Sequence, residues 1–386
     1  MTVGWDVDPR VDEWPGLPAP DGDATADACV VGLGGSGLAA VEAFADVGVS
    51  VIGIDAGRVA GWAAGRNGGF LLGGGAPSLH DAQQRWGSAV ALELYRETLA
   101  ELDRLTDQLG GDVVLRRGSI RLAGLPGSSV DTAEEADRER ERTDCATQAG
   151  VLRAAGIAAE DYDGELGTGL FLPDDGQTNP AVRVLGTGRR LAGRARLFEQ
   201  TRVRSVSAGE VVTERGTVRA AHVVVAVDGR LETLLPQLTG IVRTARLQML
   251  ATAAIASGRL PCPVYSRWGY DYAQQDSAGR LYVGGGRDQF AEHEWTTETD
   301  PTDEVQGWID QVATRMAGAS VTVDQRWAAP VGFTEDGRAL CLPVADGVVA
   351  CGGYSGTGNL VGPVATRAAV RWLLDGTAPP AYLRSE

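Results

Sequence analysis

Ala28-Cys29-Val30-Val31-Gly32-Leu33-Gly34-Gly35-Ser36-Gly37 joins a run of small apolar residues to a Gly-x-Gly-x-x-Gly pattern. A second apolar run, Val51-Ile52-Gly53-Ile54, ends in Asp55, 18 residues after Gly37. Two buried strands, a helix opening on the glycines and an acid after the second strand are typical of dinucleotide binding. We therefore predict a βαβ unit over 28–58 that binds a cofactor containing ADP. A glycine triplet alone would fit an ordinary strand–turn–helix equally well.

Each residue of this pattern has its own expected task. Gly32 permits a tight turn, Gly34 lets the backbone approach a pyrophosphate, and Gly37 lets the helix pack against the strand. The N–H groups at the start of the helix, with the positive end of its dipole, face the phosphates. Asp55 is expected to accept hydrogen bonds from the ribose hydroxyls.

Composition excludes several classes of protein. The chain has 386 residues, which is enough for two domains. Its net charge of −16 argues against nucleic acid and anionic membranes as partners, and it also fits a general role in solubility. No apolar run reaches membrane-spanning length, and the first 25 residues lack a signal-peptide pattern. The five cysteines and three histidines have no metal-ligand spacing, so we expect no metal and reduced thiols in the cytoplasm. The chain has no lysine, which excludes Schiff-base chemistry and a lysine base.

The remaining segments alternate between patterns typical of helices and patterns typical of strands. Residues 1–25 are polar and proline-rich, and we expect an arm on the surface with Trp5 and Trp14 as anchors. The first half carries helical patterns over 80–110 and 130–156 and a strand pair over 113–123. The second half carries strands over 196–230, alternating antiparallel strands over 241–330, and a strand followed by a helix over 346–374. One domain is therefore expected to be assembled from three separated segments, with the other inserted between them.

Four blocks resemble the D-amino-acid oxidase family of FAD-dependent oxidoreductases, which includes glycine oxidase, sarcosine oxidase and γ-glutamylputrescine oxidase-like proteins. The resemblance spans about residues 26–375. The blocks are Gly32–Gly37, Gly65-Arg66-Asn67-Gly68-Gly69, Val225-Ala226-Val227-Asp228-Gly229 and Cys351-Gly352-Gly353-Tyr354-Ser355-Gly356-Thr357-Gly358.

The resemblance implies an α/β fold in which a Rossmann-type FAD-binding domain is interleaved with an antiparallel-sheet substrate-binding domain. The first would comprise residues 26–80, 180–235 and 340–376, and the second residues 81–179 and 236–339. It implies that the Gly65–Gly75 loop lines the flavin and that 352–358 meets its pyrimidine edge with backbone N–H groups. The implied FAD contacts are Gly32, Gly34, Gly35, Ser36, Gly37, Asp55, Ala56, Arg66, Asn67, Gly68, Gly69, Val203, Gly229, Gly352, Gly353, Tyr354, Ser355, Gly356, Thr357 and Gly358.

Three departures from the family pattern matter. Trp62-Ala63-Ala64-Gly65 lacks the serine that often precedes the Arg-Asn pair, which removes one expected flavin contact. Val331 stands where glycine oxidase-like members carry the arginine that clamps the substrate carboxylate, which disfavours a simple α-amino acid. Ala329 stands where sarcosine oxidases attach flavin through cysteine, so FAD is expected to be non-covalent.

The resemblance implies oxidation of a C–N bond. A hydride passes from the α-carbon of a neutral amine to flavin N5, and the imine hydrolyses; the flavin carries the chemistry. No residue is singled out as catalytic. The partner is a small-molecule amine or amino-acid derivative, with oxygen as the expected electron acceptor. The alternatives are an amine dehydrogenase that uses another acceptor, an NAD-linked dehydrogenase, and a flavin-binding protein without turnover.

Substrate contacts are expected from the antiparallel sheet and near the flavin. They are Tyr265, Arg267, Tyr270, Tyr272, Arg287, Trp327 and Tyr354. Arg287 follows three glycines and could pair bidentately with a carboxylate, although a structural ion pair at a strand end fits it as well. The tyrosines, taken singly, fit ordinary sheet packing.

Overall fold

The computed structural model describes residues 3–384 and contains two compact units. The six-stranded unit comprises Asp8–Arg66, Asn179–Ala245 and Pro330–Glu386. The eight-stranded unit comprises Met1–Val7, Asn67–Thr178 and Arg246–Ala329. These bounds differ from the predicted domains at residues 236–245 and 330–339, which fall in the six-stranded unit, and at residues 67–80, which fall in the eight-stranded unit. Within the eight-stranded unit, the N–H of Gly73 donates to Asp175.

The central sheet of the six-stranded unit is parallel except at one edge. Its order is β19-β20-β13-β2-β3-β9, and only β19 runs antiparallel to its neighbour. The strands are β2 (Ala28–Val31), β3 (Val51–Ile54), β9 (Arg196–Phe198), β13 (His222–Val225), β19 (Leu340–Ala345) and β20 (Val348–Gly352). Every residue of β2 is buried, as expected for a parallel strand covered on both faces. The mixed α/β class and the Rossmann-type connection of the sequence prediction are confirmed.

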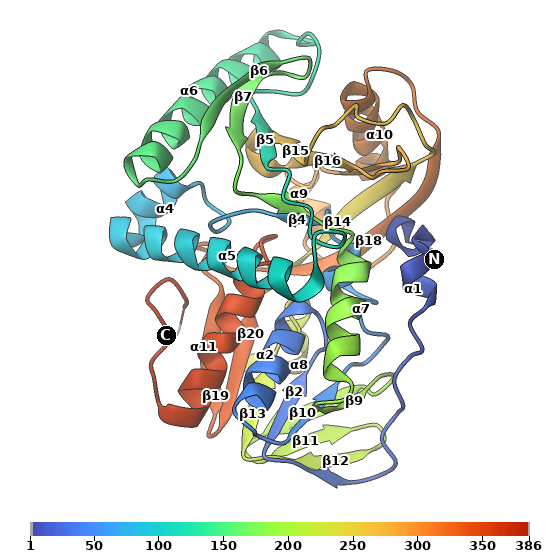
Figure 1. The fold of residues 1–386 in the computed structure, drawn as a ribbon, viewed down its shortest axis with the longest axis vertical. Helices are drawn as coiled ribbons and strands as arrows, with labels where there is room; N and C mark the ends of the chain where they lie inside the picture. Colours follow the sequence, from blue (N-terminus) through green and yellow to red (C-terminus); the bar gives the residue numbers. More distant parts are fainter. Residues whose placement is uncertain (1–2, 385–386) are drawn as a thin grey trace. The chain divides into compact units, whose positions relative to one another are not determined.

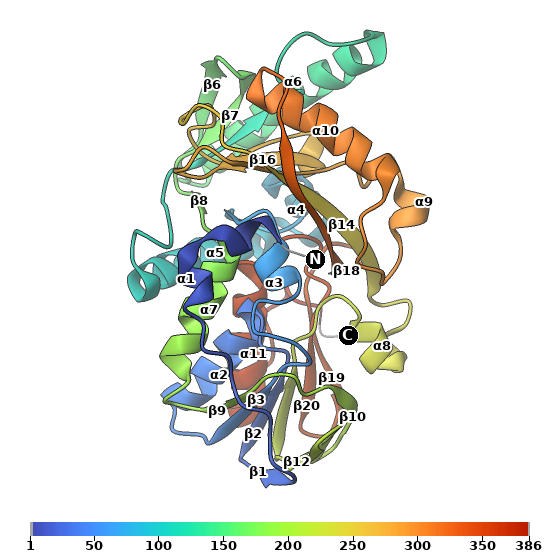
Figure 2. The same cartoon turned by 90° about the vertical axis from the view of Figure 1, so that its right-hand side faces the viewer.

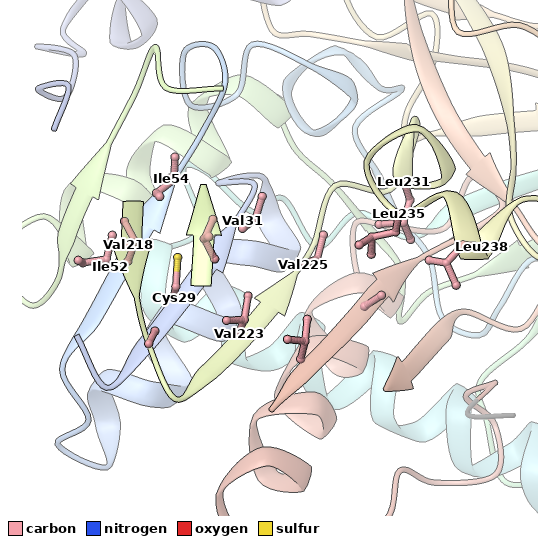
Figure 3. Packing of buried hydrophobic residues seen from close by; sticks show 14 of the residues in the cluster. Cys29, Val31, Ile52, Ile54, Val218, Val223, Val225, Leu231, Leu235 and Leu238 are labelled. Atoms are coloured by element: carbon pink, nitrogen blue, oxygen red, sulfur yellow. The ribbon is translucent and has the colours of Figure 1, made fainter. Parts of the chain in front are cut away.

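Helices and a second sheet cover the two faces of this sheet (Figure 1). The helices that pack together on one face are α2 (Gly35–Asp46), α7 (Pro180–Leu191) and α11 (Val361–Asp375). A four-stranded sheet, of β1 (Ala24–Thr25), β12 (Gly216–Arg219), β11 (Glu210–Thr213) and β10 (Val203–Ser207), packs on the other face. Figure 3 shows the apolar cluster between the sheets, where Cys29 and Val31 lie near Val218. Short helices complete the unit: α1 (Pro9–Asp12), α3 (Ala63–Arg66), α8 (Leu231–Leu234) and η2 (Pro236–Leu238).

The sheet of the eight-stranded unit is mixed, with order β18-β14-β17-β16-β15-β5-β7-β6. Figure 2 shows its strands β18, β14 and β16. Its strands are β5 (Ser119–Leu122), β6 (Glu160–Gly164), β7 (Gly167–Leu172), β14 (Arg243–Thr252), β15 (Val264–Ser266), β16 (Asp271–Gln275), β17 (Leu281–Gly284) and β18 (Val323–Phe333). The antiparallel prediction holds for β14–β17–β16–β15 and β5–β7–β6, whereas β15 and β5 pair in parallel. Three strands, β5, β6 and β7, come from outside the predicted range 241–330.

One helix of this unit was not predicted. The alternating pattern expected over 241–330 is interrupted by α10 (Asp303–Ala317), which packs on the sheet. Its apolar residues Val305, Ile309, Val312 and Met316 recur at helical spacing, and Gly318 ends it in the left-handed conformation. The remaining short elements are η1 (Gly4–Val7), β4 (Phe70–Leu71), β8 (Gly176–Gln177), η3 (Arg267–Gly269) and α9 (Ala291–Glu294).

The long helices predicted from periodicity are present with one change. Residues 80–110 form two helices, α4 (Leu79–Trp86) and α5 (Ser88–Leu109), because Gly87 adopts φ +91° between them. The helix predicted over 130–156 is α6 (Thr132–Ala154). The prediction of two strands over 113–123 is wrong. This segment contains one strand, β5, and Leu115 makes only an isolated bridge to Gln177. Within residues 3–384, no helix combines the length and apolar character needed to cross a membrane.

Candidate functional site

The turn between β2 and α2 accepts only glycine at two positions. Gly32 has φ +93°, and a Cβ there would lie 2.6 Å from the carbonyl oxygen of Ala226. A Cβ on Gly37 would lie 1.7 Å from the carbonyl oxygen of Gly32. The helix therefore starts as close to the strand as a backbone allows, as the sequence pattern predicts.

The N-terminus of α2 has the properties of an anion site. Its N-cap is Gly34, and no side chain caps the helix. Gly35 lies beneath the guanidinium of Arg183, which donates a 2.8 Å hydrogen bond to the amide oxygen of Asn359. Helix N–H groups without a side-chain cap, next to an arginine, suit a pyrophosphate.

Asp55 lies at the end of β3 and already organises the glycine turn. Its carboxylate accepts hydrogen bonds of 2.8 Å from the N–H of Leu33 and of 2.8 Å from the N–H of Gly57. Burial raises the pKa of this carboxyl. Each carboxylate oxygen retains a second lone pair, so the geometry leaves room for ribose hydroxyls as donors. Ala56 follows it in an exposed position.

Val203, expected to meet the adenine, begins β10 beside this acid. The N–H of Thr201, two residues before it, donates to the carbonyl oxygen of Asp55 at 2.9 Å. Val203 and the glycine turn thus belong to the same unit, and the segment just before Val203 is bonded to Asp55.

A second acid beside Asp55 escaped the sequence analysis. Glu199 accepts hydrogen bonds from Trp14 Nε1 at 3.0 Å, from the N–H of Leu17 at 2.9 Å and from the N–H of Val59. Its charge adds to the raised pKa of Asp55. Trp14 is therefore an anchor of the N-terminal segment, as predicted, and the partner of that anchor is Glu199.

The C-terminal glycine block forms a tight turn after β20. Gly353, Ser355 and Gly356 have φ of +64°, +52° and +90°, and the N–H of Thr357 closes a turn on the carbonyl oxygen of Tyr354. A Cβ on Gly358 would lie 2.9 Å from the ring of Tyr354, which is buried. Gly229 is equally constrained, since its Cβ would meet Pro330 O at 2.4 Å.

The Arg66–Gly69 block falls at the boundary of the two units. Arg66 ends α3 and stacks 5.6 Å from the centre of the Trp62 ring. In the eight-stranded unit, the Asn67 side chain accepts the N–H of Gly69 at 2.8 Å, and Gln274 donates to the carbonyl oxygen of Gly68.

Of the three tyrosines predicted as substrate contacts on the antiparallel sheet, two form a pair. Tyr265 and Tyr272 are direct cross-strand partners on β15 and β16. Phe70 packs edge-on against both rings, at centroid distances of 6.3 Å and 5.7 Å. Tyr270 lies outside the pair, 38% exposed at the hairpin, with the Arg287 guanidinium 5.7 Å above its ring.

The two candidate arginines make different kinds of contact. Arg267 pairs with the buried Asp271 at 2.7 Å and with Asp288. Arg287 stacks on Tyr270 and on Trp295, 5.3 Å from its centroid. Trp327 is fully buried, and a Cβ on Gly4 would lie 2.9 Å from its ring.

A group of His80, Asp81 and Asp144 has the spacing of metal ligands. His80 Nε2 lies 2.9 Å from Asp144, and the buried Arg121 binds the same carboxylate. Because a guanidinium already neutralises Asp144, we assign no metal to this group.

Comparisons with known proteins agree with a dinucleotide site. A model of the family described as FAD dependent oxidoreductase matches residues 27–372. A probable oxidoreductase, OrdL, of Rhizobium meliloti (strain 1021) is 27% identical over 375 residues, covering 91% of this chain and 83% of that protein. The γ-glutamylputrescine oxidoreductase of Escherichia coli (strain K12) is 26% identical over 287 residues, covering 68% of this chain and 65% of that protein.

Solved structures share the fold. Glycine oxidase from Geobacillus kaustophilus has a TM-score of 0.70 at 19% identity, covering 91% of this chain and 95% of that chain. L-proline dehydrogenase from P. horikoshii has a TM-score of 0.71 at 17% identity, and the match covers 95% of this chain and 96% of that chain. Together with the uncapped helix and the glycine turn, these findings make FAD the cofactor and decide against the NAD-linked alternative.

Proposed function

Because the chain belongs to the family of FAD dependent oxidoreductases, we propose that it oxidises the C–N bond of an amine or N-substituted amino acid. The product is an imine, which water hydrolyses. When bound, FAD supplies the acceptor for the hydride that leaves the α-carbon of the substrate, and oxygen then takes the electrons. The uncapped N-terminus of α2 next to the glycine turn and Asp55 carries the cofactor part of the proposal. The choice of a C–N bond is supported by the family and by the relative named for γ-glutamylputrescine.

The work left to the protein is to hold the cofactor and to orient a neutral amine. Tyr265 and Tyr272, with Phe70 against both, offer an aromatic surface that displaces water from the substrate. Burial raises the pKa of both tyrosine hydroxyls, so they stay protonated and act as hydrogen-bond donors rather than bases. A hydroxyl of this kind can orient the substrate by donating a hydrogen bond to its nitrogen, and it does not remove a proton from that nitrogen.

Two observations support an amine other than a simple α-amino acid. Val331, at the place of the family's carboxylate clamp, is an apolar buried residue. We propose Arg287, whose guanidinium lies 5.7 Å from the centre of the Tyr270 ring, as the group that binds a carboxylate of the substrate. The relative from Escherichia coli is named for γ-glutamylputrescine, which fits a larger amine.

An anaerobic screen tests this function directly. The purified yellow protein is mixed with amino acids, N-alkyl glycines, β-amino acid derivatives and polyamines, and loss of the flavin absorbance is recorded. Bleaching by one class supports the proposal, and failure of every amine to bleach the cofactor contradicts it. Admitting air then distinguishes an oxidase from a dehydrogenase. An oxidase recovers its yellow colour and forms hydrogen peroxide, whereas a dehydrogenase stays bleached until another electron acceptor is added.

The mode of FAD attachment has a separate test. Ala329, buried in β18, offers no nucleophile for a covalent bond to the flavin. Acid precipitation should therefore release all yellow colour into the supernatant, and colour that stays with the pellet would contradict non-covalent binding.

A further inference from the structure

Asp228 is a half-buried acid that neither the fingerprint nor the proposed substrate contacts include. It follows β13 and adopts φ +58°, a left-handed conformation that aspartate tolerates better than most side chains. Its carbonyl oxygen accepts the N–H of Leu231 at 3.2 Å, which fixes the start of α8. The backbone is thus bent so that the carboxylate points back into the unit.

The carboxylate of Asp228 joins two segments that are distant in sequence. Oδ1 accepts the N–H of Tyr354 at 3.1 Å, and Oδ2 accepts the N–H of Gly332 at 3.2 Å. The N–H of Gly353 makes a further contact that favours the ionised form. One side chain therefore holds the start of the C-terminal glycine turn and the end of β18.

We propose that Asp228 is a positioning residue for FAD, holding Gly353, Tyr354 and Gly332 in the arrangement that receives the cofactor. The inference rests on the proposed contacts of 352–358 with FAD. The physical basis of this role is that an ionised carboxylate has only hydrogen-bond acceptors. Both of its oxygens can therefore accept hydrogen bonds from N–H groups.

Protonation of Asp228 would disrupt this arrangement. A carboxylic acid, like an asparagine amide, turns one acceptor into a donor that faces an N–H group. Burial raises the pKa of Asp228 to about 6, and the nearby Glu232 of α8 adds to the rise. A further titratable group that interacts with it is the buried Tyr354 hydroxyl, whose own pKa is raised by burial. The carboxylate is thus poised to lose its charge in mildly acidic solution.

The test compares Asp228→Asn with Glu232→Gln. Glu232 is a matched control because its carboxylate also accepts a backbone N–H, that of Thr244 at 2.9 Å. The dissociation constant of FAD is measured by recovery of FAD fluorescence from about pH 5 to about pH 8. Losing one charged hydrogen bond should weaken FAD binding by about tenfold to a hundredfold. We expect Asp228→Asn to bind FAD weakly at every pH, and the wild type to approach that affinity as the pH falls through about 6. Glu232→Gln should bind FAD like the wild type near pH 8, and its loss of affinity should move to a lower pH, because the charge that helps to raise the pKa of Asp228 is removed.

Amide hydrogen exchange provides a readout that does not depend on FAD. In the cofactor-free wild type, exchange at Gly332, Gly353 and Tyr354 should accelerate as the pH falls through about 6, beyond the intrinsic pH effect on other buried amides. This measurement needs no variant, so it remains decisive if Asp228→Asn does not fold. Unchanged FAD affinity in Asp228→Asn, or wild-type amides without that step, would overturn the inference. A wild type that binds no FAD at any pH would instead refute the proposed function, and the amide result would still decide the role of Asp228.

Discussion

Trp5 stacks on Tyr282 with ring centroids 3.5 Å apart and an interplanar angle of 4°. Both residues are 2% exposed, and Trp5 Nε1 donates a 2.8 Å hydrogen bond to the carbonyl oxygen of Asn67. The start of the chain is therefore part of the core of the eight-stranded unit. It also fixes Asn67, which lies within the predicted flavin loop Gly65–Gly75.

Trp5→Ala should lower the free energy of unfolding by about 3–5 kcal/mol, because it leaves a cavity beneath Tyr282. Trp5→Phe keeps an aromatic ring and loses the N–H donor, so it should cost only about 1 kcal/mol. Urea denaturation of both variants measures the difference. Equal midpoints for Trp5→Ala and the wild type would show that the stack adds nothing to stability.

Asp175 makes the stability of the protein depend on pH. It accepts hydrogen bonds from Ser119 Oγ at 2.6 Å and from the N–H of Gly73 at 2.8 Å, yet burial raises its pKa from 3.8 to about 7. An acid with a raised pKa in the folded state stabilises the fold below its unfolded pKa, and this contribution is lost as the pH rises through the folded value. The free energy of unfolding should therefore fall between about pH 4 and about pH 7, by on the order of a few kcal/mol.

Asp175→Asn should flatten that decline, because asparagine does not ionise. Urea denaturation at a series of pH values measures the slope, and Asp163→Asn, at an exposed position, is the matched control. The same slope in Asp175→Asn and the wild type would rule out Asp175 as its source.

Local constraints explain what the sequence could predict. The turn at Gly32 and Gly37, β2, β3 and Asp55 lie within 28 residues, and their spacing alone specifies the dinucleotide-binding geometry. The strands β13 and β20 were also predicted, because buried parallel strands form unbroken apolar runs, whereas the antiparallel edge strand β19 was not predicted.

The contacts missed by the sequence analysis join residues far apart in the chain. Glu199 binds Trp14 across 185 positions, and Asp228 binds Tyr354 across 126. An acid at the end of a strand was visible in both cases, but no local pattern names its partner. The helix α10 was not predicted for a different reason. The aromatic residues around it indicated strands, although its own apolar residues recur at helical spacing.

Arg267→Ala and Arg287→Ala should have different effects. Removing Arg267 leaves Asp271 buried without its ion-pair partner, which should cost about 3 kcal/mol of stability. Arg287→Ala should leave the flavin spectrum and the stability near wild type and raise the KM for a carboxylate-bearing amine by about tenfold to a hundredfold.

Thermal unfolding and steady-state kinetics with the amine found in the anaerobic screen separate these outcomes. If Arg287→Ala turns over that amine like the wild type, the carboxylate anchor is wrong and an uncharged or polyamine-like substrate fits better.

Gly37→Ala should abolish FAD binding and destabilise the six-stranded unit. The new methyl group would lie 1.7 Å from the carbonyl oxygen of Gly32, a backbone atom that can move only if α2 shifts away from β2. We expect a loss of a few kcal/mol in stability. Gly150→Ala is the matched control, since it also lies in a helix but has no atom within 4 Å of the added Cβ, and it should gain about 0.5–1 kcal/mol. FAD content per chain after gel filtration, with thermal unfolding, reports both effects. Full FAD content in Gly37→Ala would mean that α2 can retreat from the strand without losing the cofactor.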